Sequence, residues 1–309
     1  MKLFKRFALV SVFLTYLLIF VGGLVRVSGA GLGCPDWPKC FGRWIPPLSI
    51  HQLPQNIDPA SFNLTLAWIE YINRLLGMLV GLSILATAIL AIIYFRKQKQ
   101  ILWPSLAAAL LVAYQGWQGG QVVTSNLRPL LVSAHMVIAF IIVSLLLYVI
   151  QQLNSLELKE PLAKNTFGGL KTFVLILWIF TIIQVLLGTE VRASIEMLSD
   201  KFPLLMNSEL LQRLGSVDEI HRTLGILLAL VTIFVAFRII KKEGGSSLSN
   251  LSWGMIFIVF IQAVLGSVQV IIGLPALMQL FHLWVASLLV GVLLLVYTSM
   301  KKGGQIRNV

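Results

Sequence analysis

The sequence predicts an all-α membrane protein in which eight transmembrane helices form two pseudo-symmetric four-helix bundles. Composition and an internal repeat carry this prediction. Of the 309 residues, 58% are hydrophobic and only 12% are charged, and the mean hydropathy is +0.89. Soluble domains carry about twice that share of charged residues. The composition therefore excludes an ordinary soluble domain.

Eight apolar segments recur along the chain, each close to the roughly 20 residues that a helix needs to cross a hydrocarbon core. The first follows Lys2, Lys5 and Arg6, as a signal peptide would, but continues without a small-residue cleavage site, so we interpret it as a helix. The predicted spans are 7–27, 66–95, 102–123, 130–150, 170–190, 215–240, 252–273 and 276–299.

The net charge of +12 suggests nucleic-acid binding at first sight, but its distribution argues against that partner. Most Lys and Arg residues lie at the two chain ends and in the loops 96–99, 151–171 and 238–242, which share one side of the membrane. The positive-inside rule makes that side cytoplasmic. We expect a multi-pass protein of the cell (inner or plasma) membrane, with both termini inside and basic contacts to anionic lipid.

The chain repeats itself, with the halves at about 1–155 and 156–309. Residues 73–77 match 221–225 at an offset of 148, and His135 matches His282 at an offset of 147. Four spans in each half give both halves the same orientation, which makes the repeat parallel and places equivalent residues at equal depth.

Three of the four histidines lie in predicted helices at repeat-equivalent positions. His221 and His282 lie on the second and fourth helices of their half, which face each other across the diagonal of an up-down bundle. Two imidazoles at one depth are typical of bis-histidine haem ligation. The alternative is that each histidine makes a core hydrogen bond or lines an aqueous cavity. Because the chain has no Cys-x-x-Cys-His motif, a haem would be bound non-covalently.

Four arginines near the outer helix ends are candidate partners of haem propionates, because a guanidinium can bind a carboxylate through two hydrogen bonds. The alternative is that they extend to the membrane surface as ordinary helix-end residues. They are Arg26, Arg74, Arg192 and Arg222.

The first half differs, because Asn73 stands where the repeat predicts a ligand opposite His135. A haem there would have one strong protein ligand, which suits oxygen chemistry better than electron transfer. Glu70, on the same helical face as Asn73, is a candidate acid, base or charge stabiliser. The alternative is a helix-end acid that interacts with the macrodipole, as the equivalent Asp218 suggests.

The two cysteines, Cys34 and Cys40, lie in the first outer loop. Thiols outside the cytoplasm tend to oxidise, so we expect a structural disulfide. A redox-active pair is the alternative.

Several stretches resemble the haem A synthase family, whose members are membrane enzymes that convert haem O to haem A. The resemblance covers nearly the full length and rests on the stretch from Gly22 to Cys40, on 70–74, and on His135, His221-Arg222 and His282. Asn73 departs from the family pattern, which usually has histidine there.

The resemblance implies a haem b cofactor on His221 and His282, a substrate haem in the N-terminal half, a carboxylate at Glu70, and the loop cysteine pair at Cys34 and Cys40. It implies successive oxidation of one ring methyl, first to an alcohol and then to a formyl group. Haem O synthase and an electron donor are the expected protein partners. The competing classes are a non-enzymatic cytochrome b-type electron carrier and a transporter.

Overall fold

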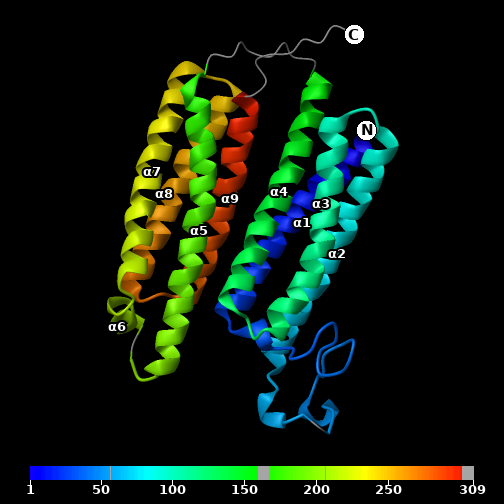
Figure 1. The fold of residues 1–309 in the computed structure, drawn as a ribbon, viewed down its shortest axis with the longest axis vertical. Helices are drawn as coiled ribbons and strands as arrows, with labels where there is room; N and C mark the ends of the chain where they lie inside the picture. The colour runs from blue at the N-terminus through cyan, green and yellow to red at the C-terminus, as the bar shows by residue number, and fades with distance from the viewer. Residues whose placement is uncertain (56, 159–166, 206, 301–309) are drawn as a thin grey trace. The chain divides into compact units, whose positions relative to one another are not determined.

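The computed structural model describes residues 1–55, 57–158, 167–205 and 207–300. These ranges contain helices and no β-strand (Figure 1). The long helices are α1 (Lys2–Val27), α2 (Leu64–Tyr94), α3 (Lys99–Thr124), α4 (Pro129–Leu158), α5 (Gly169–Lys201), α7 (Ser216–Lys242), α8 (Ser247–Ile272) and α9 (Ala276–Met300). A short helix, α6 (Asn207–Gln212), lies between α5 and α7. Parts of the basic loop and tail used to predict the orientation, 159–166 and 301–309, lie outside the described residues.

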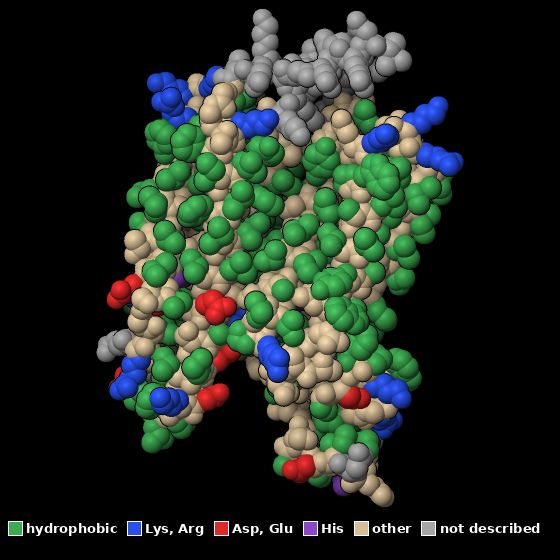
Figure 2. Space-filling view, in the orientation of Figure 1, with side chains coloured by type: hydrophobic (Ala, Val, Ile, Leu, Met, Phe, Trp, Pro, Cys, Tyr) green, Lys and Arg blue, Asp and Glu red, His purple; other side chains and the backbone are tan. Residues whose placement is uncertain are grey.

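Within the described residues, seven helices are long and apolar enough to cross a membrane, which supports a multi-pass membrane protein: α1, α2, α4, α5, α7, α8 and α9. The predicted span 102–123 is also helical, as α3, but it is not among these seven. Pro104 and three glutamines, Gln115, Gln118 and Gln121, lower its apolar character. Its passage through the membrane therefore stays a prediction. Figure 2 shows hydrophobic side chains over the flanks of the helices, with Lys and Arg gathered toward the helix ends.

The chain divides into two compact units, here called the first unit (Met1–Leu146) and the second unit (Leu147–Val309), with the division inside α4. In the first unit, a core forms where all four helices meet. Val80 and Ile84 of α2 pack there with Ala108 of α3 and Leu146 of α4, and Leu18 of α1 packs against them.

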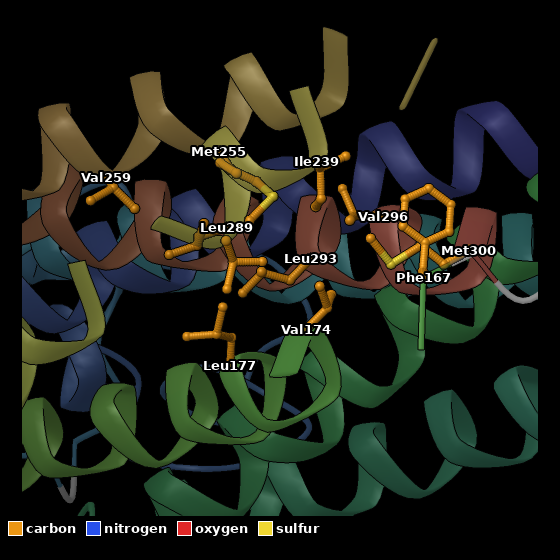
Figure 3. Packing of buried hydrophobic residues seen from close by; sticks show 12 residues of the cluster. Phe167, Val174, Leu177, Ile239, Met255, Val259, Leu289, Leu293, Val296 and Met300 are labelled. Atoms are coloured by element: carbon orange, nitrogen blue, oxygen red, sulfur yellow. The ribbon is translucent and has the colours of Figure 1, made fainter. Parts of the chain in front are cut away.

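The second unit is a four-helix arrangement around a larger apolar core, with α5 packed on both α7 and α9, and α8 packed on the same two helices. Consequently α7 and α9 occupy opposite corners, as the up-down bundle predicts. Figure 3 shows the core, in which Leu177 of α5, Met255 of α8 and Leu293 of α9 pack together.

The first unit carries an extended segment, here called the cap segment (residues 28–63), between α1 and α2. Figure 1 shows it folded beyond the ends of these two helices. It contains short 3-10 turns and leads into α2 at Asn63, whose side chain caps the helix by accepting a hydrogen bond from the Leu66 N–H (3.1 Å).

Candidate haem-binding site

The second unit brings its two helical histidines to opposite corners of one bundle. His221 lies on α7 in the first turns of the helix, and His282 lies on α9. The Nδ1 atom of His282 is buried and has no hydrogen-bond partner among the described residues. A buried imidazole that leaves a ring nitrogen unpartnered is costly as a purely structural residue, so this position fits a side chain that binds a ligand through its ring.

Glutamines of neighbouring helices hold the ligand-bearing helices in both units. The Gln262 side chain on α8 donates a hydrogen bond to the backbone carbonyl of His282 (2.8 Å). In the first unit, Gln115 of α3 makes the same bond to the carbonyl of His135 (2.9 Å). The amide nitrogens of these two glutamines therefore join neighbouring helices.

The first unit places His135 on α4 and Asn73 on α2. The Nδ1 atom of His135 and the side-chain oxygen of Asn73 are both buried without a hydrogen-bond partner among the described residues. Gln118 of α3 is also buried and keeps its Oε1 atom unpartnered. This core therefore holds one imidazole and several polar atoms that lack a partner.

A glycine on a neighbouring helix lies beside each proposed ligand histidine and beside Asn73. A Cβ added at Gly119 would lie 3.7 Å from Cε1 of His135, and one at Gly266 would lie 3.4 Å from Cε1 of His282. The same construction at Gly188 reaches Cε1 of His221 at 3.1 Å, and at Gly22 it reaches the Asn73 side-chain oxygen at 3.8 Å. Both units share this pattern, which brings the neighbouring helix close to the ligand position.

Glu70 joins α2 to the cap segment. It is 3% exposed, and its Oε2 atom accepts a hydrogen bond from the backbone N–H of Cys34 (2.7 Å). Its Oε1 atom forms an ion pair with Arg74, one turn further along α2. The contacts give Glu70 a structural role at this junction, next to the catalytic role that the sequence suggested.

Arg74 also binds the cap segment, through the backbone of the disulfide loop. Its guanidinium donates to the backbone carbonyls of Asp36 (2.8 Å), Lys39 (2.8 Å) and Cys34 (3.2 Å), as well as to Glu70. A contact from Arg74 to a propionate would require some of these bonds to exchange. That contact stays a prediction.

The cysteine pair is a disulfide, as predicted: Cys34 and Cys40 are joined and almost fully buried. Between them, the Trp37 side chain lies on Gly120 of α3, where an added Cβ would come within 2.9 Å of the indole ring. Because Gly119 faces His135, the disulfide loop covers the same part of α3 that borders the histidine. Composition and spacing gave no signal for this contact.

The remaining arginines differ in their partners. Arg222 pairs with Asp218 (2.8 Å), and 48% of its side chain stays exposed. Arg192 of α5 donates to Glu196 (2.7 Å) and to Gln279 of α9 (2.8 Å), which ties two helices of the second unit together. Arg26 lies half-buried in the last turn of α1.

The donor sets fit haem groups in both units. The second unit offers two imidazoles at opposite corners, with arginines near the same helix ends, and this set suits a six-coordinate iron with anionic propionates. The first unit offers one imidazole on α4 and one amide on α2, which suits an iron with a single strong protein ligand.

Comparisons with known proteins identify the family of the chain. A family model described as COX15-CtaA, cytochrome oxidase assembly protein, matches residues 5–294. The heme A synthase of Bartonella tribocorum is 26% identical, over 86% of this chain and 83% of its own length. That of Rickettsia africae is 23% identical, over 97% of this chain and 98% of its own length. That of Shewanella oneidensis is 34% identical over 146 residues, which are 45% of this chain and 42% of its own length.

Proposed function

The chain belongs to the COX15-CtaA family of cytochrome oxidase assembly proteins, and we propose that it oxidises haem O to haem A. The observation that carries the proposal is the pair of unlike sites on a repeated scaffold, with His221 and His282 in one unit and Asn73 and His135 in the other. An enzyme that oxidises one haem with the help of another needs two sites of this kind. Relatives named heme A synthase along nearly the full chain support the same reading.

In the second unit, His221 and His282 would hold haem b. When bound, this cofactor would supply one-electron transfer, to which a closed six-coordinate site is suited. The half-exposed Arg222 side chain is the best candidate for a propionate partner, because its guanidinium is only partly engaged by Asp218. Arg192 would take part from α5.

In the first unit, His135 would bind the iron of the substrate haem, and Asn73 would leave the opposite side without a strong protein ligand. Arg26 and Arg74 are the candidates for the propionates. The buried Glu70 carboxylate would stabilise positive charge that develops near the oxidised ring methyl. Its distance of three residues from Asn73 places both on one face of α2.

The reaction turns a methyl group into an alcohol and then into a formyl group. It removes four electrons from that carbon in total and adds one oxygen atom, so an external oxidant has to accept the electrons and an oxygen source has to supply the atom. The protein's part is to hold the substrate in one orientation, to keep bulk water from the reacting edge, and to pair developing charge. The disulfide loop serves the second task, since Trp37 covers α3 beside Gly119.

The proposal includes a membrane arrangement. Eight spans, with α3 as the third, would form a parallel repeat of residues 1–155 and 156–309, with both termini in the cytoplasm of a cell whose inner or plasma membrane holds the protein. Haem O synthase and an electron donor are the proposed protein partners, and anionic lipid would contact the basic ends.

The experiment is expression together with a haem O source, followed by pigment extraction and mass analysis. We expect the alcohol and haem A in the wild type, and loss of both in a His135→Ala variant. His51→Ala, in the exposed part of the cap segment, is the matched control. Haem b with unchanged haem O in the wild type would overturn the proposal in favour of an electron carrier, and a protein without haem would favour a transporter.

A further inference from the structure

Gln184 of α5 contacts the ring of a proposed iron ligand. Its side-chain nitrogen Nε2 lies 3.1 Å from Nδ1 of His221. The same nitrogen donates a hydrogen bond to the backbone carbonyl of His221. Gln115 and Gln262, by contrast, have hydrogen bonds to the backbones of His135 and His282. Gln184 therefore differs from them in reaching an imidazole.

Two glycines make this contact possible. Gly188 lies one turn after Gln184 on α5, and an added Cβ there would lie 3.1 Å from the His221 ring. Gly225 lies one turn after His221 on α7, and an added Cβ there would lie 3.0 Å from the Gln184 amide. Each polar side chain thus packs on the glycine of the facing helix. A methyl group at either position would crowd the pair.

The first unit keeps the two glycines but lacks the polar pair. Gly22 and Gly77 stand at the equivalent positions, whereas Leu18 replaces the glutamine and Asn73 replaces the histidine. The Gly77 position has no neighbour within 4 Å of an added Cβ, and the one at Gly22 is 3.8 Å from Asn73. The second unit therefore has both the glutamine and the histidine, and the first unit has neither.

We propose that Gln184 is a positioning residue that holds the His221 imidazole by Nδ1, in the orientation and tautomer that leave Nε2 to bind the haem b iron. The proposal rests on the proposed function, because it takes His221 as an axial ligand. A neutral imidazole that binds a metal through Nε2 carries its proton on Nδ1, and a hydrogen-bond acceptor beside Nδ1 favours this tautomer.

The Gln184 amide can serve both tautomers. Its Nε2 atom faces Nδ1 in this structure, which suits the tautomer whose proton sits on the ring Nε2. Rotation of the amide by a half turn exchanges Nε2 for Oε1, and the oxygen then accepts the hydrogen bond from Nδ1–H. The proton moves between the two ring nitrogens and none is released. The rotation gives up the bond to the His221 carbonyl and turns Oε1 toward that carbonyl oxygen, so the amide has to move away from the carbonyl as it rotates.

An acceptor on Nδ1–H makes the imidazole a stronger electron donor to the metal. The ferric state gains more from such a ligand than the ferrous state, so Gln184 lowers the reduction potential of the haem. Nδ1 of His282 has no partner among the described residues. The two axial ligands would therefore be unequal, with the stronger donor on α7.

The test measures the reduction potential and haem retention of the purified holoprotein. Gln184→Leu, which copies Leu18, is expected to raise the potential and weaken haem binding by about tenfold or more. Gln184→Glu is expected to lower the potential, because a carboxylate is a stronger acceptor. Gln262→Leu is the matched control, since it removes a glutamine that bonds only to a ligand's backbone, and its potential shift should be the smaller one.

A transplant gives a second measurement in the same protein. Asn73→His adds an imidazole to the first unit, and Leu18→Gln combined with it adds the amide partner. The double variant should have a lower first-unit haem potential than the single variant. Unchanged potentials in both Gln184 variants would overturn the inference. A wild-type protein with no bis-histidine haem, or a His221→Ala variant that retains it, would instead overturn the proposed function on which it rests.

Discussion

The two units differ most at the N-terminal end of their second helix. In the first unit, Arg74 is 15% exposed, because it pairs with Glu70 and clamps the backbone of the cap segment. In the second unit, Arg222 forms the same i, i+4 pair with Asp218 but stays 48% exposed. The same acid–arginine pair therefore holds the cap segment in the first unit and leaves its guanidinium accessible in the second.

The second difference lies in the bundle cores. Both units keep the glycines that bring neighbouring helices close to the ligand positions. The polar residues changed instead, from Gln184 and His221 in one unit to Leu18 and Asn73 in the other. A duplicated scaffold can thus diverge in chemistry while it keeps the glycines beside its ligand positions, since a few side chains at these close approaches decide which ligand binds.

The largest effect is expected at the closed site of the second unit. His221→Ala and His282→Ala should each remove the low-spin bis-histidine signal of haem b, because iron loses one axial ligand. Absorption and electron paramagnetic resonance spectra of purified protein measure it, with His51→Ala as the control. An unchanged low-spin signal in both variants contradicts the assignment.

Glu70→Gln tests the carboxylate of the first unit's i, i+4 pair. If the carboxylate stabilises charge during oxidation, haem A formation should fall by about 100-fold, as for other preorganised groups in sites with little water. Haem binding should persist, and the alcohol should accumulate. The measurement is the ratio of haem O, alcohol and haem A extracted from the variant.

Two controls separate catalysis from cap anchoring. Asp218→Asn removes the equivalent carboxylate of the second unit and should leave the ratios near wild type. Asp36→Asn loosens the cap without touching Glu70, since Asp36 accepts hydrogen bonds from the backbone of Phe41 and Gly42. A loss in Asp36→Asn equal to that in Glu70→Gln would assign Glu70 to the cap alone.

The sequence predicted the position of each long helix because an apolar run of sufficient length must be satisfied by its own backbone hydrogen bonds. It predicted helix ends less well. The predicted span 170–190 belongs to a helix that continues to Lys201. Its extra turns contain the i, i+4 ion pair of Arg192 and Glu196. Hydropathy marks the apolar length of a helix, and such a pair lets the helix continue beyond it.

The sequence indicated which residues are candidates for the site and that they recur in both halves, but it did not indicate their contacts. Equal spacing indicated that His221 and His282 belong together. It could not indicate that Gln184 reaches the His221 ring or that Arg74 bonds to the cap carbonyls, because both depend on how closely helices and loops approach. The glycines at 22, 119, 188 and 266 were the available signal, since each recurs at its repeat position.

Gly33→Ala tests the cap, which only the first unit has. An added Cβ would lie 2.4 Å from the Leu66 carbonyl oxygen, a backbone atom of α2 that cannot move aside cheaply. We expect a destabilisation of about 3 kcal/mol, at the upper end of ordinary overpacking. Thermal unfolding in detergent measures it. Gly81→Ala, where no atom lies within 4 Å of the new methyl group, is the control and should not destabilise.

The smallest effect is expected from the disulfide, which closes a loop with a sequence separation of only 6. Chain entropy assigns about 2 kcal/mol to so short a loop. In the Cys34→Ala/Cys40→Ala variant, the Arg74 and Asp36 hydrogen bonds remain to hold the loop, and alanine avoids burying new hydroxyls among Phe41 and Ala67. Haem A formation should therefore stay close to wild type, while the unfolding temperature falls slightly. Extracted haem ratios and thermal unfolding, measured on the same preparation, check both. A variant with wild-type stability that forms no haem A would show that the cysteines act as a redox pair, because loss of a purely structural disulfide would not have that effect.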